Sequence, residues 1–259
     1  MFRWIAPLLL ALSVSQNAWA DEILVAAASD LSFPMKEIIA GFEKKTGHTV
    51  KLTLGSSGNF QAQITNGAPF DIFMSADIDY IHQLDKLNLV EPGSLSVYAV
   101  GRIVVWVPNR SAIDVAKLGM NGLVHGSARR VAIANPAHAP YGRAAVAAMQ
   151  YFNVYGRVKP HLVMGENIAQ AAQFVSTGAA DIGSVALSLA MSDPMRSTGR
   201  YWEIPPVAYP RMEQGLAILS HARKAGHLDA ADAFRNWIAS NDSRVIFAKY
   251  GFLPAEPKR

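Results

Sequence analysis

The sequence has no cysteine among its 259 residues and little charge, since Asp, Glu, Lys and Arg make up 17% of the chain. The absence of cysteine excludes disulfides, a thiol nucleophile and thiolate zinc sites. The net charge of +4 comes without a long run of Lys or Arg. Because nucleic-acid binding needs a clustered basic face, we expect no nucleic-acid partner.

Motifs that carry enzyme chemistry are also missing. The segment GSSGN (55–59) is not a nucleophile elbow, because Asn59 stands where that motif needs glycine, and no P-loop, GxGxxG or HExxH motif is present. An exported hydrolase using Ser29 or Ser57 with a histidine remains an alternative, although no triad spacing supports it. The histidines are scattered singly, and no Tyr, His or carboxylate cluster suited to ferric ion is evident. We therefore predict a binding protein, not an enzyme, with no cofactor and no resident metal.

The first twenty residues have the pattern of an export signal. Arg3 precedes the apolar run IAPLLLALSV, and the small residues of AWA end at Ala20. This pattern predicts a signal peptide over residues 1–20, cleaved after Ala20. The apolar run is too short to span a bilayer, and no cysteine is present to carry a lipid. We therefore expect a soluble protein without a membrane anchor, exported to the periplasm.

The rest of the chain alternates between strand and helix patterns. Strands are predicted at 22–29, 48–55, 70–76, 101–108, 180–188 and within 128–136, with extended segments at 201–206 and 213–220. Helices are predicted at 33–47, 59–67, 77–90, 141–156, 167–178, 228–240 and 242–252. This alternation is typical of α/β sheets with helices on both faces. In such sheets ligands bind beyond the carboxyl ends of the strands.

Four polar corners occur where a helix is predicted to begin. They lie at 29–32, 56–59, 140–141 and 166–168. The start of a helix leaves backbone N–H groups unpaired and carries partial positive charge, so each corner can bind an oxyanion without Lys or Arg. Ser, Asp and Asn are also ordinary helix caps, and capping alone explains any single corner. Together, the corners suggest a small anion held between two pairs of helix starts.

These corners carry a resemblance to a known family. The sequence resembles the periplasmic molybdate-binding proteins of ABC importers in several motifs. These are AAAS before a helix, GSSG followed by NGAPFDIFMSAD, the Pro- and Gly-containing third corner, and YGF near the end. The resemblance implies the type II fold of two-lobed periplasmic solute-binding proteins, with mixed sheets flanked by helices. It implies lobe I at 21–101 and 212–259, lobe II at 102–211, and a ligand cleft between them. It also implies capture of molybdate and tungstate by a monomer that delivers them to an inner-membrane permease with its ATPase.

The matching motifs imply a set of ligand-binding residues. Ser29 and Ser57 would donate through hydroxyl and backbone N–H groups, Tyr141 and Ile168 through their backbone N–H groups, and Asp30 would lie beside them. One departure is Ala186, which stands where some family members have a tyrosine donor. The hydroxyl of Tyr141 is a candidate replacement.

The second departure is Asp30, because an ionised carboxylate repels a dianion. Either its side chain turns back to cap the helix, or it accepts a proton from an anion such as hydrogen phosphate, which would change the ligand. A ligand-sensing domain of a transcription regulator has the same fold, but the predicted export signal argues against it. Arg143 either lies over the cleft mouth, where it would attract anions, or is a solvated helix residue, which we favour.

Overall fold

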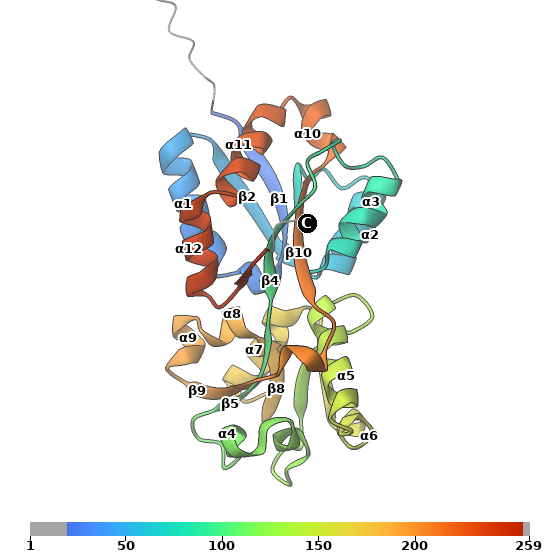
Figure 1. Cartoon of the computed structure of the whole chain (residues 1–259), viewed down its shortest axis with the longest axis vertical. Coiled ribbons are helices and arrows are strands. Elements are labelled where there is room, and N and C mark those ends of the chain that lie inside the picture. Colours follow the sequence, from blue (N-terminus) through green and yellow to red (C-terminus); the bar gives the residue numbers. More distant parts are fainter. Residues whose placement is uncertain (1–19, 256–259) are drawn as a thin grey trace, which may run out of the picture.

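The structure is a computed structural model that describes residues 20–255. The predicted signal peptide therefore lies outside the described residues, apart from Ala20. Two mixed β-sheets form the framework, and they lie one above the other in Figure 1. We call the half built on the upper sheet the first lobe and the half built on the lower sheet the second lobe. This arrangement confirms the predicted two-lobed α/β fold.

The sheet of the first lobe has six strands in the order β11-β4-β10-β3-β1-β2. Its strands are β1 (Glu22–Ala28), β2 (Thr49–Gly55), β3 (Ile72–Ser75), β4 (Ser96–Gly101), β10 (Met212–Ile218) and β11 (Leu253–Pro254). Strand β1 lies between β2 and β3 and is parallel to both, whereas β10 is antiparallel to β3 and β4. This central position explains why the inner residues of β1 form an almost continuous apolar run.

The sheet of the second lobe has five strands in the order β7-β6-β8-β5-β9. These are β5 (Ile103–Pro108), β6 (Val131–Ala134), β7 (Leu162–Gly165), β8 (Ile182–Ala186) and β9 (Gly199–Glu203). Strand β6 is parallel to β7 and β8, and β5 is antiparallel to β8 and β9. The sequence patterns missed β4, β7 and β11, and the four-residue β7 and the two-residue β11 are too short to leave a clear signal.

Helices cover both sheets. Around the first sheet lie α1 (Pro34–Thr46), α2 (Ser57–Thr65), α3 (Ile78–Lys86), α10 (Ser220–Ala225), α11 (Leu228–Ile238) and α12 (Asn241–Lys249). Around the second lie α4 (Val115–Leu118), α5 (Pro140–Tyr151), α6 (Tyr155–Val158), α7 (Ile168–Thr177), α8 (Leu187–Ala190) and α9 (Asp193–Arg196). Short 3₁₀ helices occur at η1 (Ser29–Leu31), η2 (Gly119–Val124), η3 (Lys159–His161) and η4 (Pro206–Ala208). None of the helices within residues 20–255 combines the length and apolar character needed to cross a bilayer.

Helix ends follow local sequence signals. Helix α7 begins after Asn167, whose side chain accepts a hydrogen bond from the N–H of Gln170 at 3.0 Å, and ends at Gly178 with a φ of 87°. Helix α5 has Pro140 in its first turn, where the missing N–H costs no helical hydrogen bond. These starts place the first turns of α5 and α7 at the side of the second lobe that faces the first.

Two segments connect the lobes. The chain leaves the first lobe between β4 and β5 at Arg102 and returns between β9 and β10. The Arg102 guanidinium donates to the carbonyl oxygen of Gly251 at 2.7 Å and pairs with Glu203 at 2.7 Å. This side chain therefore ties the first crossover to both lobes.

Candidate functional site

A small cavity lies where the two lobes meet. It is lined by Ala28, Ser29, Asp30, Gly55, Ser56, Ser57, Ala76, Ala139, Pro140, Tyr141 and Ile168. All five residues predicted to bind the ligand are in this set. They come from η1 and α2 of the first lobe and from α5 and α7 of the second. About 10 Å³ of its volume is open, roughly the space for the centre of one water molecule.

The second-lobe wall of the cavity offers backbone donors. Tyr141 lies in the first turn of α5, and Ile168 is the first residue of α7. Within the part of the chain that the structure describes, the backbone N–H groups of Tyr141 and Ile168 have no hydrogen-bond acceptor. The next amide of α7, that of Ala169, donates across the lobes to the hydroxyl of Ser29 at 3.2 Å. The two helix starts thus direct unpaired donors and their positive dipole ends toward the first lobe.

Ser57 contributes a donor from the first lobe. Its side chain is fully buried, and its hydroxyl oxygen accepts a hydrogen bond from the N–H of Ala76 at 3.0 Å. That contact fixes the oxygen and leaves the hydroxyl hydrogen free to donate. Residues 20–255 provide no acceptor for the backbone N–H of Ser57 either. Ser57 can therefore give two hydrogen bonds to an anion.

Ser29 joins the two lobes directly. Its hydroxyl donates to the side-chain oxygen of Asn167 at 3.1 Å and accepts from the N–H of Ala169. Asn167 caps α7, so Ser29 bonds to the helix start itself. In this closed arrangement the hydroxyl hydrogen of Ser29 is directed to Asn167, and an anion would have to compete for it.

Among the described residues that line the cavity, none is Lys, Arg or His, and Asp30 is the only carboxylate. Any anion bound there would be held by hydrogen bonds and helix dipoles alone. This arrangement favours small, fully dehydrated oxyanions, because every donor is neutral and fixed.

Asp30 does not cap a helix, and that interpretation of the sequence is wrong. Neither η1 nor α1 has a side-chain cap. The Asp30 side chain is fully buried, and its Oδ2 accepts hydrogen bonds from Tyr141 Oη at 2.8 Å and Gln214 Nε2 at 2.6 Å. Burial raises the pKa of Asp30 to about 6, although these two hydrogen bonds and the residue's own amide oppose the shift. The Asp30 carboxylate is therefore engaged in hydrogen bonds at the interface between the lobes.

The Tyr141 hydroxyl does not replace the tyrosine donor missing at Ala186. It donates to Asp30 and accepts from Gln214 Nε2 at 3.0 Å, so its hydrogen is already used within the protein. Ala186 itself is fully buried. Burial, followed by the nearby Asp30 carboxylate, raises the pKa of Tyr141 well above its usual value, so the phenol stays neutral.

Gln214 is a part of this network that sequence reasoning missed. It lies on β10 at a β-bulge, where the register shifts between Gln214 and Gly215. Its Oε1 accepts from Tyr98 Oη at 2.8 Å. Gly101 passes so close that an added Cβ would lie 2.6 Å from the Tyr141 hydroxyl and 2.8 Å from Gln214 Nε2. No local pattern predicts these contacts, because the residues come together only in the folded chain.

Further contacts close the lobes around the cavity. The N–H of Gly58 donates to the carbonyl oxygen of His138 at 2.9 Å, and Ser56 Oγ lies 2.8 Å from His138 Nδ1. Asn59 donates to Glu166, and Ser188 Oγ donates to the carbonyl oxygen of Asp30 at 2.8 Å.

Arg143 belongs to these closure contacts, which corrects the expectation of a solvated residue. It is half-buried and bonds across the lobes to Asp77 Oδ2 at 2.6 Å and Tyr80 Oη at 2.7 Å. Its guanidinium also lies 5.2 Å from the centre of the Tyr80 ring. Arg143 therefore holds α5 to the start of α3.

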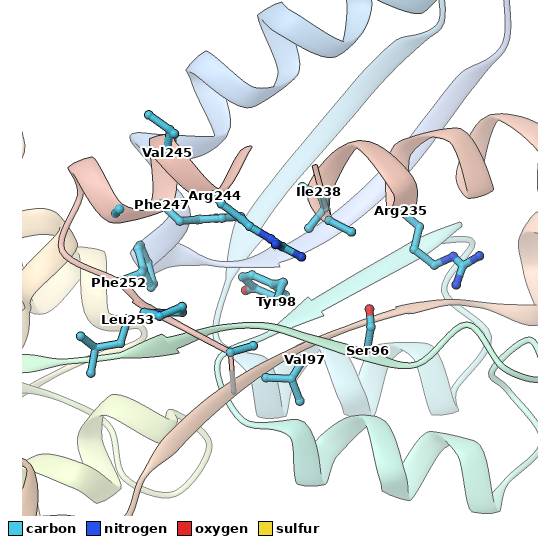
Figure 2. A pocket seen from close by; sticks show the side chains of 14 residues that line it. Ser96, Val97, Tyr98, Arg235, Ile238, Arg244, Val245, Phe247, Phe252 and Leu253 are labelled. Carbon is cyan, nitrogen blue, oxygen red and sulfur yellow. The ribbon is translucent and has the colours of Figure 1, made fainter. Parts of the chain in front are cut away.

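A much larger groove, of about 510 Å³, lies away from this site between β4, β11, α11 and α12. Figure 2 shows Tyr98, Phe247 and Phe252 around it, with Arg244 drawn next to Tyr98 and Arg235 farther along the groove. Its lining is mainly apolar and comes from the first lobe alone. No group of three or more His, Asp or Glu side chains within residues 20–255 is arranged to hold a metal ion.

Two lobes joined by two crossovers, with amide and hydroxyl donors converging on a cavity between them, define a two-lobed solute-binding protein. The chain belongs to the family described as bacterial extracellular solute-binding protein, whose model matches residues 23–253. The molybdate-binding protein ModA of Rhodobacter capsulatus is 36% identical over 95% of this chain and 94% of its own.

Two further comparisons agree. ModA of Azotobacter vinelandii is 38% identical over 91% of each chain. The solved structure of the periplasmic molybdate-binding protein of Azotobacter vinelandii matches with a TM-score of 0.82 and 30% identity. That match covers 90% of this chain and all of the other. These relatives are solute-binding proteins, and this chain is accordingly a binding protein and not an enzyme.

Proposed function

We propose that this protein captures molybdate, and also tungstate, in the cavity between its lobes and delivers it to an ABC importer. The observation that carries the proposal is the set of unpaired N–H groups at Ser57, Tyr141 and Ile168, which meet at one cavity with the Ser29 and Ser57 hydroxyls. The proposed ligand residues are Ser29, Asp30, Ser57, Tyr141 and Ile168. Relatives named for molybdate at 36% and 38% identity support the choice of ligand.

Binding requires the lobes to move. A tetrahedral oxyanion is larger than the space now open, so the lobes must separate to admit it and close around it. We propose that the first lobe (lobe I) comprises residues 21–101 and 212–259 and that the second lobe (lobe II) comprises residues 102–211. The hinge lies at the two crossovers. Sulfate is smaller than molybdate and would leave donors unpaired, at about 1–3 kcal/mol for each.

The family and its relatives support a partner and a location. We propose that residues 1–20 direct export and are removed, and that the protein works as a monomer in the periplasm. The closed, loaded form would dock on an inner-membrane permease coupled to an ATPase. Pull-down of that permease by the loaded protein, compared with the ligand-free protein, tests this step.

Calorimetric titration of residues 21–259 with molybdate, tungstate, sulfate and phosphate tests the ligand. We expect tight one-to-one binding of molybdate and tungstate, and at least tenfold weaker binding of sulfate, which corresponds to about 1.4 kcal/mol. Equal binding of all four anions, or no binding of molybdate, would contradict the proposal.

One observation favours a second candidate, a protonated oxyanion such as hydrogen phosphate. Asp30 lines the cavity, and an ionised carboxylate can accept a proton from such an anion. Asp30→Asn separates the two ligands. A phosphate carrier should lose affinity for phosphate, whereas a molybdate carrier should keep or gain affinity for molybdate.

A further inference from the structure

One oxygen of Asp30 has no partner. Asp30 Oδ1 is buried and has no hydrogen bond within the part of the chain that the structure describes. Oδ2, in contrast, accepts from two donors, Tyr141 and Gln214. Since Asp30 also lines the cavity proposed to hold the anion, the unpartnered oxygen needs a physical explanation.

The arrangement of donors decides where a proton would reside. Oδ2 uses its lone pairs to accept from Tyr141 and Gln214, so a proton on the carboxyl group belongs on Oδ1. A protonated carboxyl is a donor through that oxygen. An ionised one would leave Oδ1 buried beside a dianion without a hydrogen bond, which is unfavourable both for desolvation and for charge repulsion, and the residue's own amide offsets only part of this cost.

The ionisable groups around Asp30 do not neutralise it. Those nearest are the phenols of Tyr141 on α5 and Tyr98 on β4, and burial raises the pKa of both well above the usual value. Helix α8, which lies next to η1, has no ionisable side chain. On β2, Lys51 Nζ lies 3.8 Å from a carboxylate oxygen of Glu22. Glu166, before α7, is bonded to Asn59.

We propose that Asp30 is protonated on Oδ1 in the ligand-bound protein and donates a hydrogen bond to the oxyanion, so that binding takes up one proton. This inference rests on the proposed function. The proton comes from solvent, stays on the carboxyl group and returns to solvent on release, so that charge and atoms balance. Asp30 then acts as one more neutral donor and not as a repelling charge.

The burial that raises the pKa of Asp30 to about 6 is consistent with this proposal, and a nearby dianion raises it further. Protonation of Asp30 would then be nearly complete in the complex at neutral pH and incomplete in the free protein. By linkage, the association constant should fall about tenfold for each pH unit between the pKa of Asp30 in the free protein, about 6, and its higher pKa in the complex, and should level off above that.

Calorimetric titration with molybdate in two buffers of different ionisation enthalpy measures the protons taken up. Near neutral pH we expect close to one proton for the unmodified protein and none for Asp30→Asn. In that variant the amide group can donate where Oδ1 stood and its carbonyl can accept from Tyr141 and Gln214. The affinity of Asp30→Asn should be independent of pH and should exceed that of the unmodified protein at high pH.

The matched control is His138→Gln, because the ionisable ring of His138 contacts Ser56 at the cavity wall and is not among the hydrogen-bond partners of Asp30. It should keep the proton uptake of the unmodified protein. Loss of proton uptake in His138→Gln, or its persistence in Asp30→Asn, would overturn the proposal.

The unmodified protein alone still tests the proposal if Asp30→Asn fails to fold. Tight molybdate binding without proton uptake would refute the role of Asp30 and leave the proposed function intact, whereas absence of any molybdate binding would refute the proposed function itself. A carboxyl C=O band that appears in the infrared difference spectrum on molybdate binding, and is absent from Asp30→Asn, would support protonation directly.

Discussion

The two walls of the cavity present the same kind of donor by different means. The first lobe adds the side chains of Ser29, Ser57 and Asp30 to the backbone N–H of Ser57. The second lobe uses the backbone, since Tyr141 and Ile168 offer N–H groups and the Tyr141 hydroxyl turns away to Asp30. The first wall should therefore respond to changes of side chain, whereas the second should respond only to changes that remove an N–H.

The largest expected effect concerns Asp30, the carboxylate in the wall of the first lobe. The pKa of Asp30 is about 6 in the folded protein against an ordinary 3.8, so the folded state holds the proton more tightly. The free energy of unfolding should fall as pH rises between these values and level off above them, by up to about 3 kcal/mol. Denaturation with urea at several pH values, without ligand, measures this.

Asp30→Asn is the control for that measurement. It should remove this component of the pH dependence and leave the contributions of other groups, so its stability relative to the unmodified protein should rise with pH. A constant difference between the two proteins across the pH range would contradict the assignment.

The next effect tests the second wall. Ile168→Pro removes one N–H at the first position of α7, where proline fits a helix, and the preceding Asn167 has the extended backbone that proline requires (φ −147°, ψ 177°). Molybdate affinity should fall by about 2–3 kcal/mol, the value of a hydrogen bond to a charged group.

The matched variant Ile168→Val keeps the N–H and should bind molybdate within about threefold of the unmodified protein, despite a stability loss of about 1 kcal/mol. Calorimetry compares the two variants, and circular dichroism checks that α7 is retained. Equal losses of affinity in both would show that the side chain, and not the backbone, matters at this wall.

Ser57→Ala tests the first wall. The free hydroxyl hydrogen is lost while the backbone N–H remains, so affinity should fall by about 1.5–2 kcal/mol. The loss should be smaller than for Ile168→Pro, because water can enter the space left by the hydroxyl and bond to the anion. Ser57→Thr, which keeps the hydroxyl, should bind molybdate better than Ser57→Ala if the methyl group fits. If Ser57→Ala binds molybdate as tightly as the unmodified protein, Ser57 does not belong to the proposed ligand set.

The same comparison explains what the sequence could predict. Helix starts are local, so Pro140, Asn167 and the Ser pair at 56–57 mark the corners through their immediate neighbours in the chain. The predicted residues line one cavity because the strands and helices alternate as predicted. Gln214, Tyr98 and the partners of Asp30 could not be predicted, since a β-bulge and two crossovers bring them together from distant parts of the chain.

The smallest effect concerns the contact that holds the walls together at the cavity edge. Arg143 and Asp77 pair at 2.6 Å across the lobes, but the Arg143 side chain is 40% exposed, so solvent weakens the pair. A double-mutant cycle with Arg143→Met and Asp77→Asn should give a coupling of about 0.5–1 kcal/mol in molybdate affinity. Asp77→Asn keeps the oxygen that caps α3, so it tests the ion pair without removing the cap.

Since the pair forms between lobes, its loss should mainly speed ligand release, as measured by stopped-flow competition. The coupling between Arg143 and Asp77 should weaken in high salt. Strictly additive variants would mean that the Arg143–Asp77 pair contributes nothing to closure.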